Sequence, residues 1–195
     1  MSVNATELRL DKAMEILVSD AFVSRRGTSN ELGFYVFDYP PEDELLVREE
    51  LHGRLLRRLA EPGSPVRAVH VDLYDEVLAL LAERNILDKI QPMEDREGFP
   101  AVLEKLQRGV LRPENIAQRI VSRILPGHTL LIISGAGRAY PLIRSHTILN
   151  NLHDPVGRMT VLLMFPGTYD QKELRLFGRL KDDNYYRAFR LVGGL

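Results

Sequence analysis

The sequence predicts an α/β fold with a mainly parallel sheet of four to five strands flanked by helices, in a layered, Rossmann-like architecture. Short apolar runs of strand length alternate along the chain with stretches whose apolar residues recur at helical spacing. Two runs, Thr129 to Ser134 and Met159 to Phe165, are apolar almost throughout, which is typical of central parallel strands covered on both faces. The 195 residues, 45% of them hydrophobic, suffice for a full core, and we expect a single domain.

The first part of the chain predicts two helices and two strands. Residues 5–18 place apolar side chains at helical intervals between charges, and a polar loop follows. Residues 33–39 are aromatic and β-branched, and this strand ends at a pair of prolines, which cannot donate to a sheet ladder. Residues 42–59 begin with acids and end with arginines, which suits a helix dipole. With the strand at residues 66–73, they form a right-handed parallel unit.

The remaining chain continues this alternation. We expect a helix at residues 74–90, a helical insertion at about residues 88–125, a helix at residues 138–152 and an edge strand at residues 188–192. Prolines cut the insertion into two or three short helices. After Pro166 and Gly167 the chain reads as irregular up to the edge strand, where apolar and polar residues alternate.

Composition excludes several classes of protein. No apolar run approaches the roughly 20 residues of a membrane-spanning helix. The first residues alternate charged with apolar side chains, unlike the uninterrupted apolar segment of a signal peptide. The chain has no cysteine, which excludes disulfides, thiol catalysis and cysteine-based zinc sites and fits a reducing cytosol.

The net charge of −1 conceals a division between the two halves of the chain. Residues 1–100 carry 12 Lys and Arg against 20 Asp and Glu, a net charge of −8. Residues 101–195 carry 14 against 7, a net charge of +7. The basic half provides a surface for nucleic acid or for an acidic partner, unless the two halves neutralise each other in the folded chain.

The turn Gly135-Ala136-Gly137 is a candidate anion or nucleotide site, with Gly135 and Gly137 as the binding residues. It joins a buried strand to a helix, where backbone amides and the helix dipole attract anions. A Rossmann fingerprint requires a third glycine where this chain has Tyr140, and no Gly-Lys-Ser/Thr phosphate loop occurs. A tight strand-to-helix connection also needs small residues for its geometry alone.

His70 and Asp72 lie two apart on one strand and therefore point to the same face. They fit a metal pair or a base with its orienting carboxylate, but Asp72 also fits the N-cap of the following helix. We favour the cap, because no third ligand stands at metal spacing. No serine-hydrolase elbow occurs, and His52, His128 and His153 have no local companions. The chain therefore predicts no catalytic residue, metal or cofactor.

The segment from Leu176 to Arg190 is the densest mixture of aromatic and basic residues in the chain. Such a mixture binds nucleic acid or contacts proteins, and the acidic run at Asp182 and Asp183 favours the protein surface. The candidate partner-binding residues are Arg138, Arg144, Arg179, Tyr185, Tyr186, Arg187 and Arg190.

Three stretches together resemble the BrxB family, the small subunit of type 1 BREX bacteriophage-exclusion systems. They are GFYVFDYPPEDELLVREEL at residues 33–51, SGAGRAYPLIRSHTILNNL at residues 134–152 and FPGTYDQKELRLFGRLKDDNYYRAFRL at residues 165–191. The resemblance covers nearly the whole chain, and residues 88–125 carry little of it.

This resemblance implies a bacterial cytoplasmic protein that works beside a PglZ-type alkaline-phosphatase-like protein, a BrxC-type AAA ATPase and a PglX-type DNA methyltransferase. It implies no catalytic residue. We therefore expect a non-enzymatic interaction or adaptor subunit, with the PglZ-type protein as the first partner. The alternative is a degenerate nucleotide- or DNA-binding domain of the same system. A nucleotide-binding or nuclease-like site would use the glycine turn with Asp38, His70 or Asp72, and DNA would contact the tail.

Overall fold

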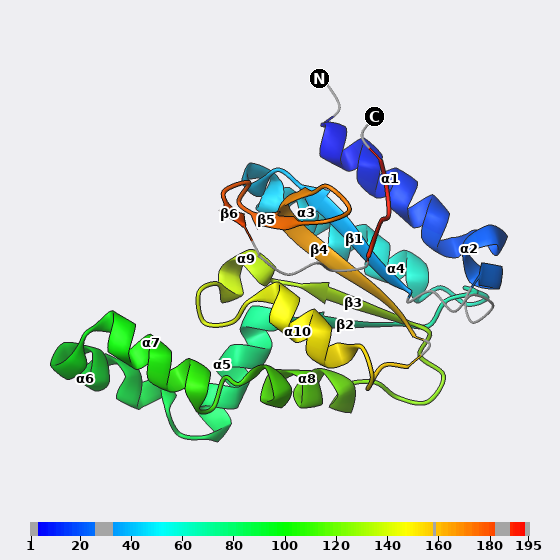
Figure 1. The fold of residues 1–195 in the computed structure, drawn as a ribbon. Coiled ribbons are helices and arrows are strands. Elements are labelled where there is room, and N and C mark those ends of the chain that lie inside the picture. The colour runs from blue at the N-terminus through cyan, green and yellow to red at the C-terminus, as the bar shows by residue number, and fades with distance from the viewer. Residues whose placement is uncertain (1–3, 26–32, 158, 182–187, 194–195) are drawn as a thin grey trace.

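The computed structural model describes residues 4–25, 33–157, 159–181 and 188–193, and within these residues the chain forms one mixed seven-stranded sheet with helices on both faces (Figure 1). Five strands are parallel, in the order β2-β3-β4-β1-β7. Their bounds are β1 Phe34–Tyr39, β2 Ala68–Asp72, β3 Leu130–Ser134, β4 Thr160–Tyr169 and β7 Phe189–Arg190. The predicted α/β fold is confirmed, and all five predicted strands are present.

The helices cover both faces of the sheet, and the face on which a helix lies depends on whether its connection runs away from β1 or back toward it. From β1 the chain runs to β2 at the far edge, and β3 and β4 then step back toward β1. The helices on the first face are α1 (Ala5–Val18), α2 (Asp20–Arg25), α3 (Glu44–Glu50), the π-helical segment η2 (Leu51–Leu55) and α4 (Leu56–Leu59), with the short 3-10 turn η1 (Pro41–Asp43) before α3. β1 and β2 are parallel, but two strands separate them, so they do not pair directly as neighbours.

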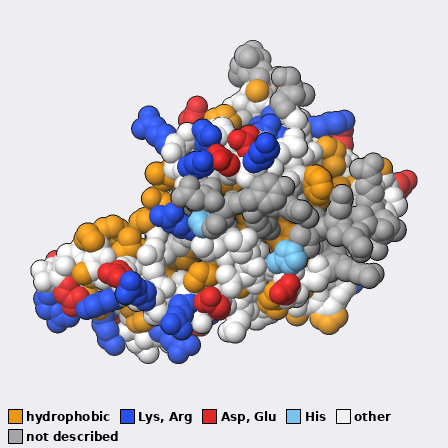
Figure 2. Space-filling view, in the orientation of Figure 1, with side chains coloured by type: hydrophobic (Ala, Val, Ile, Leu, Met, Phe, Trp, Pro, Cys, Tyr) orange, Lys and Arg blue, Asp and Glu red, His pale blue; other side chains and the backbone are white. Residues whose placement is uncertain are grey.

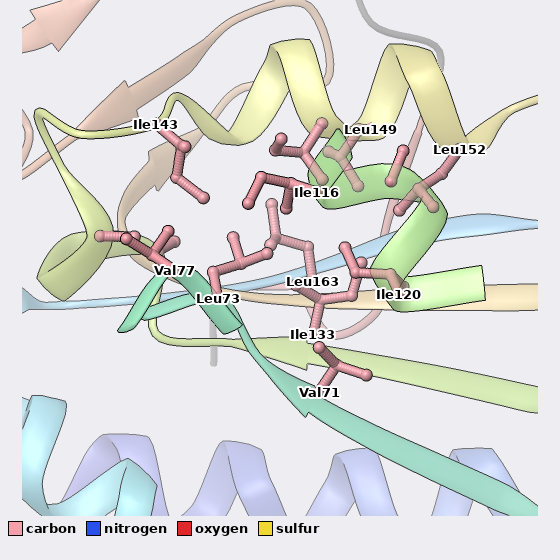
Figure 3. Packing of buried hydrophobic residues seen from close by; sticks show 14 of the residues in the cluster. Val71, Leu73, Val77, Ile116, Ile120, Ile133, Ile143, Leu149, Leu152 and Leu163 are labelled. Atoms are coloured by element: carbon pink, nitrogen blue, oxygen red, sulfur yellow. The ribbon is translucent and has the colours of Figure 1, made fainter. Parts of the chain in front are cut away.

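The second face carries the longer connections (Figure 1). Between β2 and β3 the chain forms α5 (Leu73–Glu83), α6 (Leu87–Glu97), α7 (Phe99–Arg108) and α8 (Pro113–Ser122), and between β3 and β4 it forms α9 (Ala136–Ala139) and α10 (Ser145–Leu152). α8 packs Ile116 and Ile120 into the core on this face of the sheet (Figure 3). α6 and α7 instead extend away from the sheet as a helical pair, which we call the α6–α7 arm.

The central strands are covered on both faces, as their unbroken apolar sequence predicts. Leu131 and Ile133 pack against α5, α8 and α10, whereas Leu130 and Ile132 pack against the helices of the first face. All four side chains are 0% exposed. Two hydrophobic cores therefore enclose one sheet, and Figure 3 shows part of the second core.

Two expectations for the second half are wrong. The helix expected over residues 138–152 is divided into α9 and α10, because Pro141 has no N–H to donate and interrupts the hydrogen-bonding pattern. The tail expected to be irregular after Pro166 instead continues β4 to Tyr169 and turns back antiparallel as β5 (Leu174–Leu176) and β6 (Leu180–Lys181). Gly167 permits this pairing, since a Cβ there would lie 2.1 Å from the carbonyl oxygen of Arg175.

Among the described helices, none combines the length and the apolar character that a membrane crossing requires.

Candidate functional site

Polar side chains from β2 and β3 meet at the carboxyl ends of these neighbouring strands. Asp72 ends β2 and lies in register with Ser134, the last residue of β3. Its Oδ1 accepts hydrogen bonds from the backbone N–H groups of Tyr74 at 3.0 Å and Asp75 at 3.2 Å. The predicted N-cap of α5 is therefore confirmed.

The second carboxylate oxygen of Asp72 serves a different set of donors. Asp72 Oδ2 accepts from the Ser134 hydroxyl at 3.0 Å and from the guanidinium of Arg138, which also lies over the Tyr74 ring. Ser134 Oγ in turn lies 2.8 Å from Nε2 of His70. We call Asp72, Ser134, His70, Arg138 and the adjoining His52 the carboxyl-edge cluster.

Hydrogen-bond direction defines the chemistry of this cluster. Asp72 accepts two backbone N–H groups and pairs with the Arg138 guanidinium, so its carboxylate acts as the acceptor for the Ser134 hydroxyl. Ser134 then accepts from His70, whose Nε2 must carry the hydrogen. A catalytic Ser-His-Asp triad has the opposite order, with histidine accepting the proton of serine. This geometry orients His70 and does not activate Ser134.

His70 is held neutral by its surroundings. The pKa of His70 is lowered from 6.5 to about 4, chiefly by burial and then by the nearby His52, and only Asp72 opposes the change. His52 lies on the π-helical segment η2, and its ring meets the His70 ring edge-on with 5.0 Å between centroids. The fold thus gives His52 a partner 18 residues away, which the sequence analysis missed. Single π turns inside helices are frequent at functional sites.

The glycine turn is packed against this cluster. Gly135 has φ +74°, and a Cβ on it would lie 2.2 Å from Oδ1 of Asp72. A Cβ on Gly137 would lie 2.9 Å from Cγ of Pro166. Both positions therefore need glycine for close packing. A carboxylate beside Gly135, and a helix α9 of only four residues, disfavour anion binding at this turn.

Tyr39 and Glu44 form a second polar pair beside the cluster. The buried hydroxyl of Tyr39 donates to Glu44 Oε2 at 2.7 Å. Burial raises the pKa of both side chains, while Asp72 raises and Arg138 lowers each of them. The pair is thus electrostatically coupled to the cluster across the carboxyl edge of the sheet.

Asp38, on the other side of the sheet's carboxyl edge, is the centre of a separate ion network. Its Oδ1 pairs with Arg9 at 2.9 Å, and its Oδ2 accepts from Arg190 at 2.9 Å and from the Tyr169 backbone at 3.0 Å. Arg9 also lies 5.0 Å from the centre of the Phe37 ring. This Asp38 network joins α1, β1, β4 and β7 and leaves one net positive charge.

The structure places the predicted partner-binding residues in different surroundings. Arg138 and Arg190 pair with Asp72 and Asp38, while Arg144 and Arg179 line one small pocket between α10 and β6. Three further candidates, Tyr185, Tyr186 and Arg187, lie outside the described residues. All seven stay predictions as partner contacts. Within the described ranges, no group of three His, Asp or Glu side chains is arranged to hold a metal ion.

Sequence reasoning missed several members of these sites. Glu44 follows the end of β1 by five residues, and a carboxylate so close to a strand end is a usable signal. Arg9 carries no such signal, because it reaches Asp38 from a helix 29 residues earlier. His128 and His70 also line the same large hollow of about 720 Å³ beside β2.

Comparisons with known proteins agree with the resemblance noted in the sequence. A family model described as BREX protein BrxB matches residues 69–191. A BREX protein BrxB of Bacillus cereus (strain H3081.97) is 40% identical over 187 residues, which cover 94% of this chain and 96% of the relative. Another, from Escherichia coli O9:H4 (strain HS), is 34% identical over 187 residues, which cover 95% and 91%. No solved structure matches. The chain therefore belongs to the BrxB family of BREX phage-defence proteins.

Proposed function

We propose that the chain is a non-enzymatic interaction subunit that holds other proteins of a BREX system together. Membership of the BrxB family places it in such a system. The first partner is the PglZ-type alkaline-phosphatase-like protein, followed by the BrxC-type AAA ATPase and the PglX-type methyltransferase.

The α6–α7 arm is the observation that carries this proposal. α6 contains no fully buried residue, although it is 11 residues long, and it meets the core only through side chains such as Ile90 and Met93 that stay partly exposed. Leu87 at its start is 38% exposed and Phe99 at the start of α7 is 49% exposed. Figure 2 shows hydrophobic side chains gathered on one side of the arm and charged side chains on the other. An exposed apolar surface of this kind favours a protein partner.

The polar side chains at the strand ends support the same reading. In α/β enzymes this edge of the sheet presents groups that bind and transform a substrate. Here Asp72 and Asp38 are both buried and are held by donors from within the chain. These carboxylates secure the fold, which favours an interaction role over catalysis at this edge.

A pull-down from cells that express a whole BREX operon with a tagged copy of this chain tests the proposal. We expect the wild-type chain to retain the PglZ-type protein. The double variant Leu87→Ser/Phe99→Ser should bind it at least about tenfold more weakly, because a hot-spot residue contributes on the order of 2 kcal/mol to binding. The matched control is Leu8→Ser/Leu45→Ser, which removes two exposed leucines far from the arm.

Unfolding midpoints of both variants in urea show whether the chain stays folded. Retention of the partner by a folded Leu87→Ser/Phe99→Ser variant overturns the role of the arm. Absence of every BREX protein from the wild-type pull-down overturns the adaptor function itself.

A further inference from the structure

A small basic pocket lies between the segments that follow two neighbouring strands. Its volume is about 190 Å³. One wall comes from the α9–α10 connection after β3, with Arg144 and Ser145, and the other from the β5–β6 hairpin after β4, with Arg179 and Lys181. Open parallel sheets bind ligands beside the carboxyl ends of their strands, which is where this pocket lies.

The lining is strongly cationic. The guanidinium groups of Arg144 and Arg179 make no hydrogen bond and no ion pair with any residue that the structure describes, and no Asp or Glu is among the lining residues. Lys181 is the exception, since its Nζ lies 2.8 Å from Oε1 of Glu173. Two arginines therefore line the pocket without a counter-charge from the described chain, and the repulsion between their positive charges makes a bound anion favourable.

Ser145 shows that the pocket is built for a polar ligand. It is the first residue of α10, it is only 6% exposed, and it lines the pocket. Its hydroxyl has no hydrogen-bond partner among the described residues. Arg144 is the N-cap residue of this helix, and its side chain does not cap the first-turn N–H groups. The unpaired hydroxyl of a buried serine, the uncapped start of α10 and two arginines thus lie around one small space.

We propose that this pocket binds the phosphate group of a small phosphate monoester. Its volume of about 190 Å³ is below the roughly 300–1,000 Å³ of pockets that enclose a drug-sized ligand, so it holds a phosphate group and leaves the rest of the ligand outside. A phosphate offers three acceptor oxygens and close to two negative charges, which match two guanidiniums and a hydroxyl better than a singly charged carboxylate does. The inference is independent of the proposed adaptor function.

Isothermal titration calorimetry of the full chain at low ionic strength tests it, with inorganic phosphate, AMP, adenosine and acetate as probes. Phosphate and AMP should bind with similar affinity, adenosine should not bind, and acetate should bind at least about tenfold more weakly. Phosphate binding should weaken as the pH falls from 7.5 to 5.5, because the dianion takes up a proton near pH 6.

Variants assign the site. Arg144→Gln/Arg179→Gln should lose at least about tenfold in phosphate affinity, and Ser145→Ala about three- to tenfold. The matched control, Arg57→Gln/Arg84→Gln, removes two exposed arginines without ion pairs among the described residues and should change the affinity less than twofold. Unchanged thermal unfolding without ligand verifies that each variant is folded.

Three results overturn the proposal. The first is the absence of binding heat with phosphate and AMP. The second is an equal loss of phosphate affinity in the Arg57→Gln/Arg84→Gln control, which shows that phosphate is attracted by the overall positive charge and not by this pocket. The third is equal binding of acetate and phosphate, which assigns the pocket to the carboxylate side chain of a protein.

Discussion

The hydroxyl of Ser134 donates a hydrogen bond to the carboxylate of Asp72 at 3.0 Å, across the carboxyl ends of β3 and β2. The oxygen of the same hydroxyl lies 2.8 Å from His70 Nε2. One buried serine therefore connects a helix cap to a histidine on the edge strand, and its loss affects both.

Replacement Ser134→Ala should destabilise the chain by about 1–3 kcal/mol, because it leaves the N–H of His70 without an acceptor and removes a donor from Asp72. Urea unfolding followed by circular dichroism measures the difference. The control Ser122→Ala removes an exposed hydroxyl that bonds only to the carbonyl of Arg119, and it should change stability by less than about 0.5 kcal/mol. Equal losses of stability in the two variants would show that the buried hydroxyl of Ser134 stabilises the chain no more than the exposed hydroxyl of Ser122.

His70 should make the stability of the chain depend on pH. Its folded-state pKa of about 4 lies below its ordinary value of 6.5, so the unfolded chain binds the proton first as the pH falls. The contribution of His70 to the free energy of unfolding is therefore complete above pH 6.5 and declines between pH 6.5 and pH 4. At pH 5 the loss should reach about 1–2 kcal/mol.

The replacement His70→Gln removes the titrating group and keeps an N–H donor for Ser134. Its free energy of unfolding should decline less than that of the wild type between pH 7.5 and pH 5, as measured by urea unfolding at both pH values. The idea fails if both proteins show the same decline.

Gly135 and Gly63 offer a matched test of close packing. Both have a positive φ, +74° and +85°, but a Cβ on Gly135 meets Asp72, whereas a Cβ on Gly63 meets nothing within 4 Å. Gly63→Ala should therefore cost only the left-handed backbone strain, about 1–2 kcal/mol. Gly135→Ala should cost about 1–3 kcal/mol more, since Asp72 must move from its cap and its serine. Similar unfolding free energies for the two variants would rule out the steric contact with Asp72.

The parallel strands could be predicted because burial on both faces leaves an unbroken apolar run, as in Leu130 to Ile133. The order of the strands could not, since direct pairing of β1 with β2 suits the same local patterns as the observed order. The β5–β6 hairpin was missed because its strands are short, and Pro166 reads locally as a strand end.

The same limits apply to the candidate sites. The cap at Asp72 is local, and its spacing to the next helix reveals it. The contact of His52 with His70, and the position of Arg144 in the same pocket as β6, depend on how distant segments fold together, so no spacing in the sequence reports them.

Asp38 provides the last prediction, because it is the buried acid between two guanidiniums. The side chains of Arg9 and Asp38 are 14% and 8% exposed, so water screens this pair only weakly. Asp38→Asn leaves Arg9 and Arg190 facing each other without the negative charge, and the chain should lose about 3–5 kcal/mol of stability. Asp11→Asn breaks an ion pair with Arg54 in which the side chains are 46% and 50% exposed, and it should cost no more than about 1 kcal/mol. Urea unfolding measures the loss of stability in both variants. If Asp38→Asn loses as little as Asp11→Asn, the Asp38 network does not hold α1 and β7 in place.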